Sequence, residues 1–135
     1  MIGDILKGIK TKYTGSELAS VLTGGLWDMQ APEGTVFPYA TVQIISNMNY
    51  PVFTNNMEFF RIHFNIVSDN MNKDATNVGI NALESALRTL FDGEQLSGTG
   101  WTTTNMVWQK SEPVLSFSNK TIGVMVEYET HIVYS

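Results

Sequence analysis

The side chains best suited to catalysis or metal binding are the two histidines of the sequence, His63 and His131. His131 lies in an alternating stretch near the C-terminus, on the same face as Glu127 and Glu129. An imidazole beside carboxylates can hold a metal ion or act as a general base. Residues two apart on a strand lie about 6.6 Å from each other, however, which suits a solvated polar face equally well. A direct pairing of His63 with His131 across two strands would favour a metal or base site; the sequence alone predicts no catalytic residue, metal ligand or cofactor.

Other motifs that are associated with catalysis are incomplete. Gly98-Thr99-Gly100 resembles part of a phosphate-binding loop, but no Lys-Ser/Thr follows it and the next element is expected to be a strand. The sequence has no Gly-x-Ser-x-Gly nucleophile elbow. It also has no cysteine, which excludes disulfides, thiolate metal ligands and cysteine nucleophiles. These observations favour a protein that binds other proteins over an enzyme.

Length and composition are those of one weakly charged domain, residues 1–135. Charged residues make up 16% of the chain, against about 25% in an average soluble protein, and the net charge is −5. Such a surface is poorly defended against self-association, which indicates a homo-oligomer. Lysine and arginine are scattered, which argues against a nucleic-acid-binding protein. No apolar run approaches the ~18 residues that span a bilayer, and the N-terminus does not resemble a signal peptide, so no membrane association is expected.

Three helices are expected from apolar residues spaced three and four apart. The first begins at the N-terminus and uses Ile2, Ile5, Leu6 and Ile9 as its apolar face. Ser16 is expected to cap a short second helix. The strongest helical pattern runs from Val78 to Phe91, and Asp92-Gly93 should end it.

Five strands are expected from β-branched and aromatic residues and from alternation. Their ranges are Tyr39–Ser46, Met57–Ser68, Trp101–Lys110, Val114–Ser118 and Ile122–Tyr134. Turns are expected at Asn47–Asn56 and Asn119-Lys120, with a break at Glu112-Pro113. This order predicts an α+β fold, a mostly antiparallel sheet with long hairpin strands and helices packed on one face. The last strand is longer than a small core needs, so its free end is expected to pair with something.

The loop within Leu26–Ser46 is the main candidate for an interaction surface, because Ala31-Pro32 and Phe37-Pro38 give it a defined shape. Tryptophans are usually packed in a core or an interface. Trp101 and Trp108 are seven positions apart, so in one strand they would face opposite sides and one would be exposed, as suits a subunit contact. The predicted interface residues are Trp27, Met29, Met48, Tyr50, Val52, Phe53 and Trp101.

Taken together, these segments resemble the tail-completion and tail-terminator (head–tail joining) proteins of long-tailed bacteriophages. The resemblance rests on SELASVLTGG, WDMQAPEGTVFPYATVQ, FFRIHFNIVS, NVGINALESALRTLFDG and KSEPVLSFSNKTIGVMVEYETHIVYS. It implies an α+β virion structural protein, assembled in the host cytoplasm, that forms a hexameric ring on the tail tube. It also implies that the ring ends tube polymerisation and contacts the tail-tube protein and the head connector or head-closure protein. The family has no catalytic residues to carry over.

Charge is compatible with such a ring. Six copies at −5 each would carry about −30 in total, which repels DNA phosphates and lets DNA pass through the lumen without specific binding. Three alternatives remain at this point. The chain could be another neck or tail-tube component, or a small-ligand-binding α+β domain with a cleft between the proline loop and the sheet. It could also be an enzyme built on His63, His131, Glu127 and Glu129.

Overall fold

The structure is a computed structural model that describes residues 2–49, 57–68, 80–116 and 121–134. Its helices are α1 (Ile2–Tyr13), α2 (Glu17–Val21) and α3 (Ile80–Phe91). Its strands are β1 (Gly25–Asp28), β2 (Tyr39–Asn49), β3 (Met57–Ser68), β4 (Ser97–Gly98), β5 (Trp101–Thr103), β6 (Val107–Ser116) and β7 (Thr121–Tyr134). The seven strands form one sheet in the order β1-β2-β3-β7-β5-β4, and β6 pairs with β7 beside β5. Only the β1–β2 pair is parallel among the described strands.

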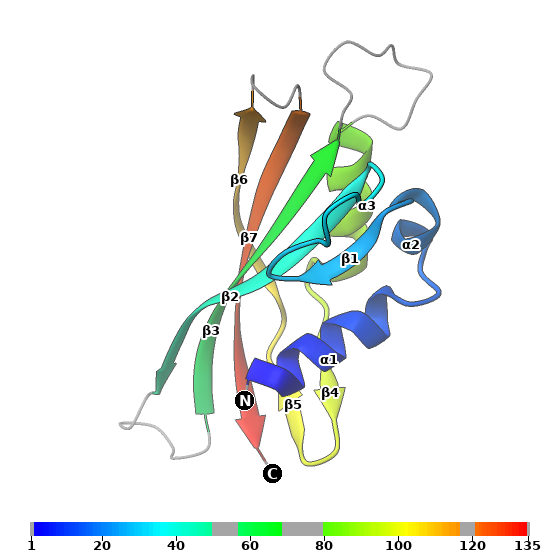
Figure 1. Cartoon of the computed structure of the whole chain (residues 1–135). Coiled ribbons are helices and arrows are strands. Elements are labelled where there is room, and N and C mark those ends of the chain that lie inside the picture. Colours follow the sequence, from blue (N-terminus) through cyan, green and yellow to red (C-terminus); the bar gives the residue numbers. More distant parts are fainter. Residues whose placement is uncertain (1, 50–56, 69–79, 117–120, 135) are drawn as a thin grey trace.

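Alternating residues of β3 and β7 form the sheet side of the core. The members that point to this side are buried, namely Phe60, Ile62, Phe64, Ile66, Val124, Val126, Tyr128 and Ile132. The three helices lie on this side of the sheet, as Figure 1 shows. From α3, Leu83, Leu87 and Phe91 are fully buried, and the Phe91 ring stacks on Phe64 with centroids 4.8 Å apart. The predicted α+β fold with helices on one face is therefore confirmed.

The helix ends agree with the sequence signals. Ser16 is the N-cap of α2, where its hydroxyl accepts a hydrogen bond from the Ala19 amide at 3.3 Å. After α3, Gly93 takes a left-handed conformation (φ 71°), which ends the helix where a residue with a side chain would be strained. The part of the predicted helix before Ile80, including Val78, lies outside the described residues. No described helix is long and apolar enough to cross a membrane.

The strands after α3 differ from the prediction. Residues 101–110 are not one strand: β5 and β6 pair with different stretches of β7, Ile132–Tyr134 and Thr121–Glu129. The Thr104 amide still donates to a β7 carbonyl, that of His131, at 2.8 Å, but the Met106 amide donates to the Glu94 carbonyl instead, also at 2.8 Å, and this interrupts the strand before β6 begins.

Two predicted interruptions of the strands are also wrong. Pro113 lies inside β6, which pairs only with β7 in the described chain; an edge strand tolerates proline because its outer side needs no ladder donor. Asn47–Asn49 are the end of β2 and not a turn, since they pair with Glu58, Phe59 and Phe60 of β3. Residues 50–56 of this predicted turn, and the predicted Asn119-Lys120 turn, fall outside the described residues.

β7, the longest strand, is the central strand of the sheet. It pairs with β3 along one side, and with β6 and then β5 along the other. The free end of the last strand was expected to pair with something, and this chain itself provides both neighbours. Among the described residues, the strands with an unpaired side are β6 at one margin, β1 with the end of β2 at the opposite margin, and the short β4. The β2–β3 and β6–β7 pairs extend toward opposite ends of the molecule (Figure 1).

Candidate interaction surfaces

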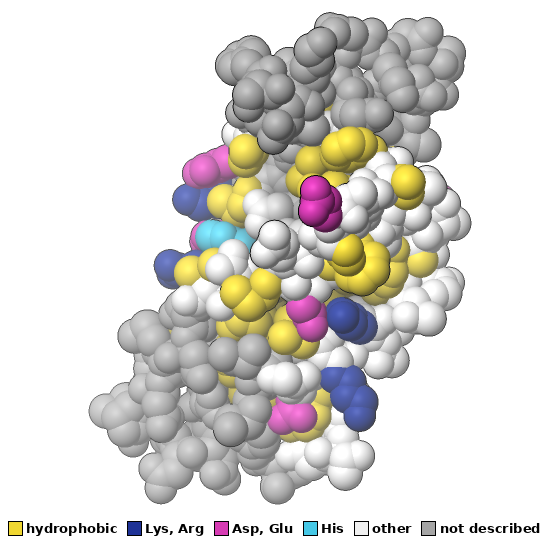
Figure 2. Space-filling model, in the orientation of Figure 1, with side chains coloured by type: hydrophobic (Ala, Val, Ile, Leu, Met, Phe, Trp, Pro, Cys, Tyr) yellow, Lys and Arg dark blue, Asp and Glu magenta, His cyan; other side chains and the backbone are white. Residues whose placement is uncertain are grey.

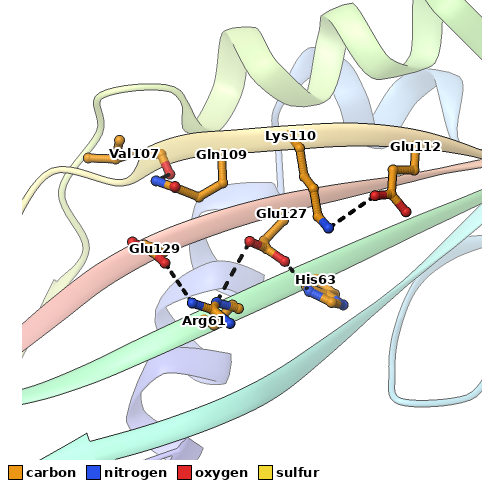
Figure 3. Close-up of polar contacts among 8 residues, drawn as sticks. All are labelled: Arg61, His63, Val107, Gln109, Lys110, Glu112, Glu127 and Glu129. Atoms are coloured by element: carbon orange, nitrogen blue, oxygen red, sulfur yellow. Dashed lines mark hydrogen bonds and ion pairs between the residues drawn. The ribbon is translucent and has the colours of Figure 1, made fainter.

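The residues that could do chemistry lie on the sheet face opposite the helices. The His63 ring nitrogen Nε2 is 2.7 Å from Glu127 Oε1, its direct neighbour on β7. Arg61 donates from Nη2 to Glu129 Oε1 at 3.0 Å, and its Nε lies 3.7 Å from Glu127 Oε2 (Figure 3). The Arg61 Nε is buried and makes no hydrogen bond in the described structure. The hydrogen bond to Glu129 raises the pKa of Arg61 further above its ordinary value, so this guanidinium stays charged.

The two histidines are not brought together. His131 lies opposite Phe59, with ring centroids 5.2 Å apart, and it is four positions along β7 from the partner of His63. Four positions on a strand correspond to about 13 Å. In the described part of the chain, no cluster of three or more histidine, aspartate and glutamate side chains has the geometry to hold a metal ion. The direct pairing of His63 with His131, which would have favoured a metal or base site, therefore does not occur in this fold.

Charges on this face are matched locally. Lys110 of β6 pairs with Glu112 at 3.0 Å, and this hydrogen bond raises the pKa of Lys110 (Figure 3). At the left edge of Figure 2, side chains of lysine or arginine, of acidic residues and of histidine lie next to one another. Short-range pairing of this kind is typical of a solvated sheet face and leaves little net charge to attract an ionic ligand.

A first apolar surface lies on β1 and on the loop that follows it. It consists of Trp27, Met29, Val36 and Phe37, which are 37%, 66%, 56% and 37% exposed; we call it the Trp27 surface. Figure 2 shows hydrophobic side chains exposed in the region where β1 lies in Figure 1. The predicted interface residues Trp27 and Met29 are thus at the surface, and their contact with a partner stays a prediction.

Backbone hydrogen bonds hold the loop of the Trp27 surface in place. The Gly24 amide donates to the Pro38 carbonyl at 2.8 Å, and the Met29 amide donates to the Val42 carbonyl at 2.9 Å. Met29 has a left-handed backbone (φ 62°), uncommon for a residue with a side chain. The Phe37-Pro38 peptide bond is cis, and the Phe37 ring stacks on Tyr39 at 5.6 Å. The apolar side chains are therefore presented by an ordered loop, in agreement with the expectation from the two proline positions.

The structure does not place the other five predicted interface residues on the Trp27 surface. Trp101 belongs to the hydrophobic core, packed beside Gly8 and Gly98, so it is not the exposed member of the tryptophan pair. The opposite-faces argument is wrong because Trp101 and Trp108 belong to different strands. The backbone of Met48 lies in β2, and Tyr50, Val52 and Phe53 fall outside the described residues.

Three exposed apolar side chains lie on β6, which we call the β6 edge: Val107, Trp108 and Val114, exposed to 54%, 37% and 52%. The register with β7 places Trp108 on the helix side of the sheet, opposite Tyr128, and Val107 and Val114 on the other side, opposite Glu129 and Gly123. Trp108 donates from Nε1 to Ser111 Oγ at 3.0 Å, and Ser111 in turn donates to Glu84 of α3 at 2.7 Å. The guanidinium of Arg88 lies 4.1 Å from the Trp108 ring centroid, a cation–π contact. The sequence predicted that one of Trp101 and Trp108 would be exposed, and the exposed one is Trp108, whereas Trp101 was the residue selected for the interface.

The described hollows in the surface lie elsewhere. A groove of about 710 Å³ runs between α2 and α3 and is lined by residues such as Leu18, Ala86 and Leu90. A second, of about 420 Å³, lies along α1 and ends at Asp28. Neither lies between the proline loop and the sheet, where the ligand-binding alternative expected a cleft.

Comparison with known proteins gives a likeness in fold. No protein-family model and no curated protein matches the sequence. Among solved structures, a chain of the virion of a native gene transfer agent (GTA) particle superposes with a TM-score of 0.63 at 10% identity, over 93% of this chain and 91% of that one. A second solved structure, of a protein known only by a sequence identifier, superposes with a TM-score of 0.68 at 10% identity, over 100% of this chain and 97% of that one. This chain thus shares its fold with these two proteins, over 93% and 100% of its length.

Proposed function

We propose that this chain is a structural protein of a bacteriophage-like virion that caps the tail tube, ends its polymerisation and forms the head–tail joining interface. The observation that carries the proposal is the likeness in fold to a chain of a GTA virion, which extends over nearly the whole length of both chains. A likeness of this extent involves the complete arrangement of helices and sheet, and not a single shared hairpin or helix.

The surface of the molecule supports the same proposal. The Trp27 surface is presented by a hydrogen-bonded loop, and β6 at the opposite margin has further exposed apolar side chains, as expected of a part that docks with other proteins. Its partners in this role are further copies in a ring, with six as the expected number, the tail-tube protein and the head connector. The net charge of −5 per copy suits a ring through which DNA passes without specific binding.

Another neck or tail-tube component of the same particle is the nearest alternative, because the same fold likeness supports it. Position in the particle separates the two roles. A cap occupies one end of the tube, whereas a tube protein repeats along its length.

The test uses particles produced with and without the gene for this chain. We expect gold-labelled antibody to mark only the head-proximal end of each tail in electron micrographs. We also expect tails made without the protein to be overlong and to lack heads, because nothing stops tube growth. Label along the whole tube, or normal tail lengths in its absence, would contradict the proposal. A complementing plasmid that encodes the unaltered chain is the control.

A further inference from the structure

We propose that the outer edge of β2, from Gln43 to Asn49, receives an extended segment of a different protein, which adds to the sheet as a further strand. β1 covers only the first part of this edge, because Gly25–Asp28 pair with Tyr39–Val42. No described strand pairs with the outer side of residues 43–49, and Figure 1 shows β2 continuing past the end of β1. The inference rests on the proposed function, since the segment comes from another protein of the same particle.

The backbone of β2 directs hydrogen-bonding groups outward along this edge. The Met29 amide donates to the Val42 carbonyl at 2.9 Å, so the backbone groups of Val42 point away from β3. In a strand these groups alternate between the two sides, and therefore the N–H and C=O of Ile44 also point outward. β1 ends at Asp28, and Met29 makes the last hydrogen bond from this segment to β2. Within the described chain, the outward groups of Ile44 are thus available to another strand.

The composition of this edge does not protect it from strand addition. Residues 43–49 (QIISNMN) include neither a charged residue nor a proline. The opposite margin differs, because β6 contains Lys110, Glu112 and Pro113, which are residues of the kinds that block edge-to-edge pairing. A bulge interrupts both strands, so the bulge does not distinguish the two margins. The margin that is open to a further strand is therefore that of β2.

The described margins of this chain do not supply the added strand. β1 has four residues and β4 has two, and β6 carries the blocking residues just named. The remaining edge is that of β2 itself, and pairing of β2 with β2 would be a two-fold contact that closes at two copies. Two copies are too few to cover the end of a tube. The occupant to which the edge is suited is therefore an extended segment of a different protein.

The length and surroundings of the edge define the kind of segment. Residues 43–49 can accommodate a strand of ordinary length, about five or six residues. In strand addition, main-chain hydrogen bonds give affinity and alternate side chains give specificity. Ile45 on this edge is 44% exposed, and Met29 of the Trp27 surface, which borders the start of the edge, is 66% exposed. The segment that fits is thus uncharged, free of proline and rich in β-branched or aromatic residues, and its end contacts the Trp27 surface.

Hydrogen exchange, resolved to single amides by mass spectrometry, tests the inference. In the purified chain the Ile44 amide should exchange without protection, because it has no acceptor. In purified particles its exchange should be slower by roughly 100-fold, because the added strand supplies an acceptor. Unchanged exchange in the particle would overturn the inference. Protection already present in the purified chain would also overturn it, because a second copy would then cover the edge.

Variants at Ile45 provide a matched pair. Ile45→Lys places a charge on the edge and should lower incorporation into particles by roughly tenfold, whereas the uncharged, β-branched Ile45→Thr should be incorporated normally. Circular dichroism checks that both variants are folded, as expected for an exposed position. Equal incorporation of the two folded variants would contradict the proposal.

Cross-linking identifies the occupant, because the chain has no cysteine of its own. Ile45→Cys labelled with benzophenone maleimide and built into particles should cross-link to a different protein. Cross-links to a second copy of this chain would overturn the inference. The antibody label at the tail end reports on the proposed function independently of all three measurements.

Discussion

Replacing Gly24 with alanine is expected to destabilise the chain and to disturb the Trp27 surface together. A Cβ atom at this position would lie 2.0 Å from the carbonyl oxygen of Val36 and 2.8 Å from the Cβ of Tyr39. The nearest of these is a backbone atom, so no side-chain rotation can relieve the overlap. The segment before β1 would have to move away from the loop, which breaks the 2.8 Å hydrogen bond from the Gly24 amide to the Pro38 carbonyl.

The magnitude follows from these two effects. Loss of one backbone hydrogen bond costs about 1 kcal/mol of unfolding free energy. Forced displacement of packed atoms costs about 1–3 kcal/mol more. For a chain of this length, 1 kcal/mol corresponds to roughly 3–5 °C in Tm, so we expect Gly24→Ala to lower Tm by roughly 6–20 °C.

Thermal unfolding followed by circular dichroism is the assay, and Gly3→Ala is its matched control. Gly3 lies in α1, and a methyl group added there would have no neighbouring atom within 4 Å, so alanine should leave Tm unchanged or raise it slightly through helix propensity. A Gly24→Ala variant that melts within about 2 °C of the unaltered chain would refute the reasoning. If Gly24→Ala is folded at lower temperature, it should also associate less, because the loop that presents Trp27 has moved.

Three further predictions concern the core. Gly123→Ala should destabilise strongly, by about 2–4 kcal/mol in denaturant unfolding, because its Cβ would lie 2.7 Å from the Ile66 carbonyl oxygen in the β3–β7 ladder. Leu87→Ala should cost about 2–5 kcal/mol through the cavity it leaves, yet leave association of the folded chain unchanged, since its side chain is fully buried. Burial, and next the hydrogen bond to Asp92, raise the pKa of Tyr128 above its ordinary value near 10. The unfolded chain therefore loses this proton first, so stability is retained below about pH 10 and falls above it by up to about 1.4 kcal/mol per pH unit, a dependence that Tyr128→Phe should reduce.

Local sequence patterns are sufficient to predict those elements whose structure depends only on residues near one another in the sequence. Met57–Ser68 alternates large apolar with polar residues, and the strand, its length and its buried face follow from that alternation alone. Ser16 and Gly93 mark helix ends through backbone geometry that few other residues adopt easily. These features are set within a few residues of one another, and therefore the sequence predicts them.

The errors occur where a distant partner decides the structure. The stretch from Trp101 to Lys110 alternates like a single strand, but the amide of Met106 donates to the carbonyl of Glu94 and not to β7, which no local pattern reveals. Pro113 indicates a break only if its strand is central, because a central strand excludes proline, whereas β6 is at the margin. Strand order therefore determines how each of these residues is to be interpreted, and strand order is a tertiary property.

The candidate surfaces show the same limit from the functional side. The proline loop has a shape that its sequence predicts, so Trp27 and Met29 could be selected before the fold was known. For the two later tryptophans the sequence predicted one exposed side chain but the wrong member was selected, because Trp108 is exposed only as a result of β6 pairing with β7 and with nothing beyond it in the described chain. Which apolar side chains stay exposed at the margins of the sheet is thus a property of topology.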